Sequence, residues 1–212
     1  MANDSRAIVT EVADAIAVIR FNRPHERNPL SLQTLHDLQT TLLKVALNAD
    51  IHAIIFTGTG DVFASGANIK ELALLDSASA LEFSRLGQRV FQTIANSKQI
   101  TIAAVNGYCM GGALDLALSC DIRVASRNAV FAHPGASLGI ITGWGGTQRL
   151  PILIGRARAL ELFATARRID SNEALSIGLV TEVEDPVLAC ARTIAAQRQH
   201  LRPSDIATTI LR

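Results

Sequence analysis

The sequence has few cysteines, and they are not grouped. The three are Cys109, Cys120 and Cys190, and no two of them have the C-x-x-C spacing. An odd number of scattered cysteines in apolar surroundings indicates reduced thiols, and it argues against both a disulfide framework and a cysteine-based metal site. Reduced thiols are typical of the cytoplasm, which is the location that we expect.

The chain also has almost no net charge. Its 20 Lys and Arg residues nearly balance its 19 Asp and Glu residues, giving a formal charge of +1. A nucleic acid or an anionic membrane attracts a clearly basic surface, so we expect neither as a partner. The N-terminal segment MANDSRAIVTEV lacks the apolar core of a signal peptide, and no apolar run has the length that spans a bilayer.

Short apolar runs instead alternate with amphipathic segments along the whole sequence. The 212 residues, 49% of them hydrophobic, are enough for the core of one globular domain, and no stretch has the composition of a linker. Ser31 is placed to cap a helix that runs to about Ala46, with one apolar face. That face consists of Leu32, Leu35, Leu38, Leu42 and Val45. The alternation predicts an α/β fold.

The most informative stretch runs from residue 100 to residue 121. Ile100 to Val105 is typical of a buried strand, and Gly111 and Gly112 precede an apolar helical segment with Asp115 in its first turn. A strand that passes through glycines into a helix directs free N–H groups at one point. That point suits an anion or an oxygen that becomes one during a reaction. A tight turn with Asp115 as a helix cap is the alternative.

A second stretch of the same design lies upstream. Ile51 to Thr57 is predicted as a buried strand, residues 58–68 are mostly small, and a helix follows from about Ile69. Two such units place two helix N-termini at one edge of a sheet. Two backbone N–H groups can then converge on one oxygen atom.

Two motifs that glycine-rich chains often contain are missing. The run from Gly139 to Thr147 has no Lys-Ser/Thr after it, so it does not match a phosphate-binding loop. Ser65 lies in A-S-G-A and has no G-x-S-x-G nucleophile elbow around it. A serine hydrolase is therefore disfavoured.

With both loops in view, the sequence resembles the enoyl-CoA hydratase/isomerase (crotonase) family. The matching segments are FNRPHERNPL, TGTGDVFASGANIKEL, AAVNGYCMGGALDLALSCDIRVAS, LGIITGWGGTQRLPILIG and SNEALSIGLVTEV. They occur in the family's order and at about its spacing, from Ala7 to about Val183. The resemblance implies a spiral of ββα repeats, assembly as a homotrimer or a dimer of trimers, and an acyl-CoA thioester as substrate.

The resemblance also implies a set of site residues. The backbone N–H groups of Ala67 and Gly112 would form an oxyanion hole for the thioester oxygen. Backbone groups at Ala64, Ala67 and Ile69 would hold the adenine of coenzyme A, which enters as part of the substrate and not as a tightly bound cofactor. Lys70 and Arg23 are candidate phosphate contacts, with solvated surface charge as the alternative. No metal is implied.

The chain departs from the family at the acid/base positions. A hydratase of this family has two glutamates, and the equivalent positions here are Asp115 and Gly135. Dienoyl-CoA isomerases resemble this chain in carrying Asp at the first position but keep a carboxylate at the second; dihydroxynaphthoyl-CoA synthases are among those that lack one there. The sequence therefore leaves hydration, isomerisation and decarboxylation open.

We expect Asp115 to face the pocket, to be ionised by the helix dipole and to be the main acid/base group. His133 stands two residues before Gly135, so in an extended strand it would face the same way and could replace the second carboxylate. A water molecule in the space left by Gly135 and a purely structural His133 are the alternatives.

The end of the chain is a second departure, because the family usually continues with more C-terminal helix. We expect a spiral core over residues 1–185 and a shortened C-terminal helical region over residues 186–212. The predicted function is an enzyme of the enoyl-CoA hydratase/isomerase type, a lyase or isomerase that stabilises a thioester enolate. A non-catalytic acyl-CoA-binding or assembly protein is the alternative from a different class.

Overall fold

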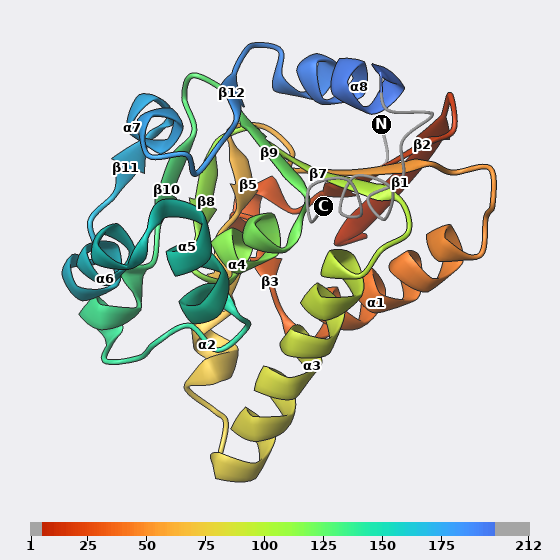
Figure 1. The fold of residues 1–212 in the computed structure, drawn as a ribbon. Helices are drawn as coiled ribbons and strands as arrows, with labels where there is room; N and C mark the ends of the chain where they lie inside the picture. The colour runs from red at the N-terminus through yellow and green to blue at the C-terminus, as the bar shows by residue number, and fades with distance from the viewer. Residues whose placement is uncertain (1–5, 198–212) are drawn as a thin grey trace, which may run out of the picture.

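The protein was examined as a computed structural model, which describes residues 6–197. Its main layer is a six-stranded sheet in the order β1-β2-β4-β7-β9-β12 (Figure 1). These strands are Ile8–Ala13, Ile16–Phe21, Ala53–Thr57, Ile100–Val105, Ile122–Ala125 and Glu182–Val183. Only β1 and β2 pair antiparallel within this sheet, and the remaining described pairs are parallel.

A smaller sheet has the order β11-β10-β8-β5, and β3 and β6 form a separate parallel pair. In chain order these strands are β3 (Pro29–Leu30), β5 (Val62–Ala64), β6 (Gly66–Ala67), β8 (Tyr108–Met110), β10 (Val130–Ala132) and β11 (Ile169–Asp170). Strands β4, β7 and β9 lie in the large sheet. The strand that follows each of them along the chain lies in the small sheet; these strands are β5, β8 and β10.

Helices follow these strand pairs. They are α1 (Leu32–Ala46), α2 (Ile69–Leu72), α3 (Ser77–Ala95), α4 (Gly112–Ser119), α5 (Gly146–Ile154), α6 (Arg156–Thr165), α7 (Ser171–Ser176) and α8 (Val187–Gln197). Two short 3-10 helices, η1 (Pro24–Glu26) and η2 (Pro134–Leu138), interrupt loops. The repeated order of strand, strand and helix confirms the predicted α/β fold of ββα units.

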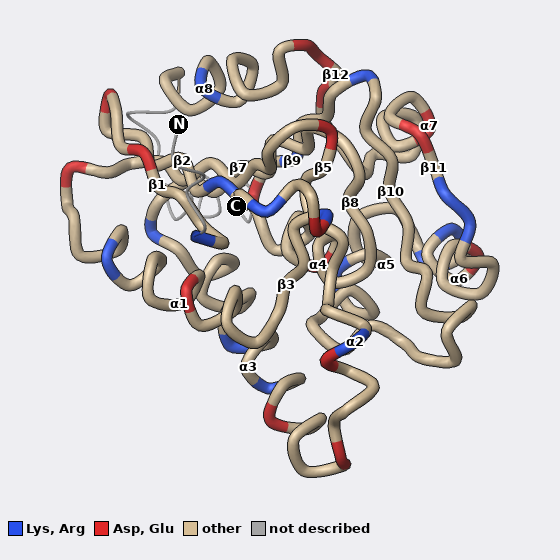
Figure 2. Tube along the Cα trace, turned by 180° about the vertical axis from the view of Figure 1, so that it is seen from behind, with Lys and Arg blue, Asp and Glu red and all other residues tan. Residues whose placement is uncertain are grey.

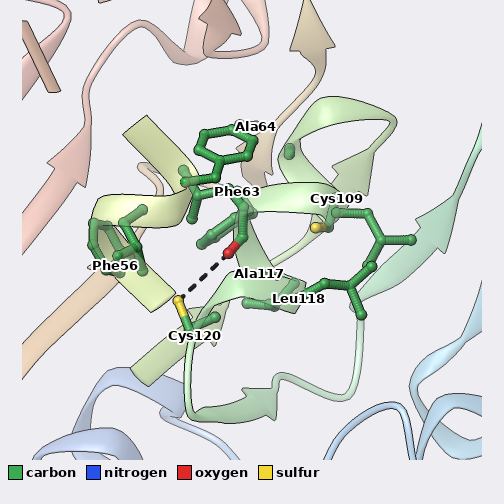
Figure 3. Close-up of a cluster of buried hydrophobic side chains, with 14 of the residues drawn as sticks. Phe56, Phe63, Ala64, Cys109, Ala117, Leu118 and Cys120 are labelled. Atoms are coloured by element: carbon green, nitrogen blue, oxygen red, sulfur yellow. Dashed lines mark hydrogen bonds between the residues drawn. The ribbon is translucent and has the colours of Figure 1, made fainter. Parts of the chain in front are cut away.

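The core lies between the sheets and around α4. Every residue of α4 is buried, as expected for a helix that is apolar on all sides. Figure 3 shows Phe63 of β5, Cys109 of β8 and Ala117 of α4 in one cluster. Because α4 is enclosed, its first residue, Gly112, has a fixed position relative to both sheets.

Helix α8 lies across the six-stranded sheet, at the top of Figure 1. Its buried residues Val187, Ala191 and Ala195 pack against Val18 and Ile55 of that sheet. The predicted boundary at residue 185 stays a prediction, and residues 198–212 of the expected C-terminal region lie outside the described part of the chain.

Local signals placed most elements, with differences at their ends. Ser31 caps α1 as predicted, its hydroxyl accepting a hydrogen bond from the Thr34 N–H. Leu32 is 48% exposed, so its assignment to the buried face was wrong. Helix α3 begins at Ser77, because Asp76 caps it in a capping box. Strands β5, β6 and β8 were not predicted, since each has only two or three residues.

Charged residues of both signs are spread along the described chain (Figure 2). None of its helices is long and apolar enough to cross a membrane. No cluster of three or more His, Cys, Asp or Glu side chains within residues 6–197 could hold a metal ion.

One charged side chain is buried and holds the end of α4. The Arg123 guanidinium donates hydrogen bonds to the carbonyls of Cys120 (2.6 Å) and Leu179 (3.0 Å), with longer ones to Ala117 and Asp121. The last carbonyls of a helix lack partners within the helix and carry its negative dipole end. Arg123 satisfies them and connects α4 to the segment before β12.

Replacing Arg123 should therefore destabilise the fold. Arg123→Met leaves several buried carbonyls without a donor, and we expect the free energy of unfolding to fall by about 3 kcal/mol. Arg85, an exposed arginine on α3 that pairs with Glu82, is the matched control. Arg85→Met should cost about 0.5 kcal/mol or less. Urea unfolding of both variants measures the difference, and equal losses would contradict the role of Arg123.

Candidate functional site

A cavity with a volume of about 690 Å³ opens beside the N-terminus of α4. Its walls are mainly apolar and come from the loop before α2, the start of α3, the segment from His133 to Trp144, and α6. The lining residues that matter below are Ser65, Ala67, Ile69, Gly111, Gly112, His133, Gly135, Thr142, Trp144 and Phe163. Ala67 and Gly112, the two residues predicted to form the oxyanion hole, both line this cavity.

The two glycine-rich loops meet at the cavity wall. Gly66 has a φ of +84°, which favours glycine, and a Cβ at this position would lie 2.8 Å from the Gly112 nitrogen. The Asn106 side chain ties the turns together by accepting from the Gly58 N–H (2.8 Å) and donating to the Gly60 carbonyl (2.8 Å). The two loops are therefore in contact at Gly66 and Gly112, and the convergence of their N–H groups on one oxygen stays a prediction.

Trp144 fixes Gly112 from the other side. Its ring packs edge-on against Phe83 and Phe91, with centroid distances of 5.2 and 5.5 Å. A Cβ at Gly112 or at Gly87 would overlap this ring, so both glycines are needed for the close approach. The indole thereby joins α3 to α4 next to the cavity.

Asp115 lies one turn further along α4, but it does not line the cavity. Its side chain is fully buried, and one carboxylate oxygen accepts a hydrogen bond from the Thr142 hydroxyl. A Cβ at Gly146 would overlap the other oxygen, Oδ1. Burial raises the pKa of Asp115 to about 6, although the Thr142 hydroxyl and the amides of Trp144 and Gly146 act to lower it. Desolvation therefore outweighs the helix dipole that we expected to favour ionisation, although a carboxyl with a pKa of about 6 is still ionised at pH 7.

His133 lies between Asp115 and the cavity. Its Nε2 is 3.5 Å from Asp115 Oδ1, and its ring stacks at a tilt on Phe163 with the centroids 4.9 Å apart. Burial lowers the pKa of His133 to about 4. The imidazole is therefore neutral at pH 7, and the contact with Asp115 is not an ion pair.

The route by which His133 reaches the cavity differs from the predicted one. The segment after His133 is the 3-10 helix η2 and not an extended strand, so the i, i+2 argument does not apply. Gly135 also leaves no space for a water molecule in place of a side chain. A Cβ there would lie 2.5 Å from the Ile140 carbonyl oxygen, which fills that direction.

The residues predicted to bind coenzyme A divide into two groups. Ala67 and Ile69 line the cavity. Ala64 is completely buried in β5, and Lys70 is exposed next to the cavity without lining it. Arg23 lies in the loop at η1, where its N–H donates to the Asn28 side chain (2.7 Å), and it does not line the cavity either.

Sequence reasoning missed three residues that shape the site. Thr142 and Trp144 lie in the glycine-rich run 139–147, whose lack of a phosphate-binding signature drew attention away from its other side chains. Asn28 donates to the carbonyls of Val62 (2.9 Å) and Phe63 (3.2 Å), and so holds the first loop against β5. A buried asparagine between two prolines has no sequence signal that separates it from a turn residue.

Asp115 and His133 should have opposite effects on how the free energy of unfolding changes with pH. The folded protein keeps a proton on Asp115 that the unfolded chain releases between about pH 4 and about pH 6, so this group stabilises less as pH rises. The folded protein lacks a proton on His133 that the unfolded chain holds between about pH 4 and about pH 6.5, so this group stabilises more as pH rises.

Replacing one residue of the pair should remove its contribution to the pH dependence of stability and leave that of the other. Relative to the unsubstituted protein, His133→Gln should lose stability as pH rises from about 4 to about 6.5, and Asp115→Asn should gain it, each by up to about 3 kcal/mol. Urea unfolding at several pH values measures both slopes. Slopes of the same sign would show that the two pKa shifts are not both present.

The sequence is similar to characterised relatives over most of its length. A short-chain-enoyl-CoA hydratase from Clostridium acetobutylicum is 39% identical over 180 residues, which cover 84% of this chain and 69% of that protein. A crotonyl-CoA hydratase from Syntrophomonas wolfei is 42% identical over 180 residues, with the same coverage of 84% and 69%.

Solved structures agree with the sequence matches. DspI from Pseudomonas aeruginosa has a TM-score of 0.90 at 34% identity, covering 99% of this chain and 86% of that chain. An enoyl-CoA hydratase from Bacillus anthracis has a TM-score of 0.87 at 36% identity, covering 91% and 76%. The family model described as enoyl-CoA hydratase/isomerase matches residues 11–209. The chain therefore belongs to the enoyl-CoA hydratase/isomerase family.

Proposed function

We propose that the protein is an acyl-CoA isomerase that stabilises a thioester enolate in a backbone oxyanion hole formed by Ala67 and Gly112. The observation that carries the proposal is that two small-residue loops meet at a cavity wall. One loop leads through β6 into α2, and the other leads into α4. Two aligned N–H donors are what an enolate oxygen requires. The thioester class is supported by the family and by its relatives, which are enoyl-CoA hydratases.

The orientation of both N–H groups supports this pairing. Gly112 is the first residue of α4, and the first N–H groups of a helix have no acceptor within it. Ala67 lies in β6, which pairs only with β3 among the described strands, and Pro29 of β3 has no N–H to donate. Neighbouring residues of a strand direct their backbone groups to opposite sides. Because Pro29 cannot donate, its pairing with Gly66 uses the N–H and C=O groups of Gly66, which therefore face β3. The N–H of the next residue, Ala67, then faces away from β3.

The composition of the cavity wall favours isomerisation over hydration. Addition of water needs one group to activate the water and another to protonate the α-carbon, whereas a double-bond shift needs one proton carrier. No Asp or Glu is among the described residues that line the cavity. In this proposal Asp115 is the acid/base carboxylate, and it lies behind the cavity wall and not in it.

The remaining expectations complete the proposal. Coenzyme A is held as part of the substrate, with Ala67 and Ile69 as the contacts that the cavity supports best and Ala64, Lys70 and Arg23 as outer candidates. Assembly as a homotrimer or a dimer of trimers and a cytoplasmic location are proposed on the family alone. A non-catalytic acyl-CoA-binding protein is the competing function.

Turnover of two thioesters separates these functions. A 3-enoyl-CoA should be converted to the conjugated 2-enoyl thioester, which raises the ultraviolet absorbance. Hydration of a 2-enoyl-CoA lowers that absorbance, and we expect it to be at least about 100-fold slower because a second acid/base group is absent. Rapid hydration would overturn the isomerase assignment, and acyl-CoA binding without any turnover would favour the binding protein.

Removing a single N–H tests the oxyanion hole directly. Incorporating lactic acid in place of Ala67 replaces the N–H by an oxygen and keeps the methyl side chain, and we expect kcat to fall about 100-fold. The same replacement at Ala49, which is exposed in the loop before β4, is the control and should leave kcat unchanged. An equal effect at both positions would assign the loss to the ester bond itself and not to the oxyanion hole.

A further inference from the structure

The cavity offers a substrate one titratable side chain, His133. The other described lining residues are apolar or carry only hydroxyl or backbone groups. Asp115, the carboxylate that the sequence marks as the acid/base, is fully buried and absent from the lining. A proton that moves between protein side chain and substrate in this cavity therefore meets the imidazole first.

Three polar atoms of this pair have no hydrogen-bond partner. Asp115 Oδ1 and both ring nitrogens of His133 are buried and unsatisfied within the described protein. Such atoms are rare in folded proteins, and each needs a physical explanation. The separation of 3.5 Å between His133 Nε2 and Asp115 Oδ1 is longer than a normal hydrogen bond. Catalytic hydrogen bonds are often long in an unliganded site and shorten when substrate binds.

The surroundings fix the carboxylate on one side of the buried imidazole, and the cavity that His133 lines is on another. Thr142 donates to Oδ2 of Asp115, which leaves Oδ1 on the side of His133. Phe163 holds the imidazole ring by its face. With Nε2 toward Asp115, Nδ1 is the ring nitrogen left to meet a substrate.

We propose that His133 is the catalytic proton carrier and that Asp115 is the positioning residue that acts through it. The proposal deepens the proposed function, since it assumes an enolate at Ala67 and Gly112, and it replaces the direct action of Asp115 by a relay. The resting imidazole carries its proton on Nε2, directed at Asp115 Oδ1, and has a lone pair on Nδ1.

The relay balances without another reactant. The C–H bond at the substrate carbon between the thioester carbonyl and the double bond breaks, and its proton moves to Nδ1 of His133. The electron pair forms the enolate, whose oxygen accepts from the two backbone N–H groups. The Asp115 carboxylate stabilises the imidazolium through Nε2–H, and the same proton then returns to the far carbon of the conjugated enolate.

The charged and titratable neighbours of the pair are few. Arg149 of α5 acts on Asp115 to lower its pKa, and burial keeps the pKa of the Cys109 thiol on β8 well above its usual range. Burial of Asp115 raises its pKa to about 6, so the carboxylate that the relay needs is lost below that pH. We therefore expect kcat to fall as pH drops through about 6.

Two measurements test the relay. A saturated acyl-CoA in D₂O reports proton removal alone, because its α-protons exchange for deuterium and mass spectrometry detects the exchange. The kcat for a 3-enoyl-CoA reports proton removal together with isomerisation. His133→Gln should slow exchange and kcat by about 100-fold or more, with KM within about twofold. His133→Ala should be inactive and regain part of its activity when imidazole is added, which a structural role would not give. His36→Gln, on the exposed side of α1, is the matched control.

Asp115→Asn should lower kcat less, by about 10-fold, and should remove the decrease of kcat near pH 6. Circular dichroism verifies that each variant is folded. Exchange unchanged in His133→Gln but abolished in Asp115→Asn would overturn the relay and return the direct role to Asp115. If the unsubstituted protein binds acyl-CoA but exchanges no α-proton, both the relay and the isomerase assignment fail while acyl-CoA binding stands.

Discussion

The parallel pairing of β4 with β7 is the constraint on which the site depends. It aligns two strands so that their following loops leave the sheet at the same edge, and Asn106 then ties those loops together. The loops continue into β5 and β8, which pair again in the second sheet. The two pairings, the second of which contains a register shift between Val62 and Ala64, thus bring Gly66 and Gly112 into contact.

Close packing at the same place limits the residues that can occupy it. Gly66 and Gly112 have no room for a Cβ, the first because of backbone and the second because of the Trp144 ring. The indole is held in turn by Phe83 and Phe91 of α3. Arg123 closes the opposite end of α4. The helix that begins at the proposed oxyanion hole is therefore fixed at both ends.

The burial of two titratable side chains, Asp115 and His133, beside the site carries a desolvation cost. Asp115 and His133 are desolvated, and three of their atoms lack hydrogen bonds. Burial shifts the pKa of Asp115 upward to about 6 and that of His133 downward to about 4, so at pH 7 the carboxylate is still ionised and the imidazole is neutral. A site with one such pair differs from a site with two carboxylates in its ability to activate water for addition to the double bond. Membership of the family thus gives the fold, whereas in the proposed mechanism the pair of Asp115 and His133 decides the reaction.

The sequence by itself determined the architecture and the location of the site. Apolar runs ending in glycine, the Ser31 cap and the small-residue loops are local signals, because strand burial, helix capping and close backbone approach each restrict residue type at fixed positions. These signals were sufficient to predict that two small-residue loops meet, and the family resemblance then pointed to Ala67 and Gly112, which line one cavity.

Only the tertiary structure decided the environment of the side chains. Asp115 looked like an ionised group in a helix's first turn, yet the segment from Thr142 to Gly146 covers it and reverses the shift of its pKa. His133 reaches Asp115 through a 3-10 turn and not through strand parity, and Gly135 is closed by the carbonyl of Ile140. Desolvation depends on what packs against a group from distant parts of the chain, and no local pattern encodes that.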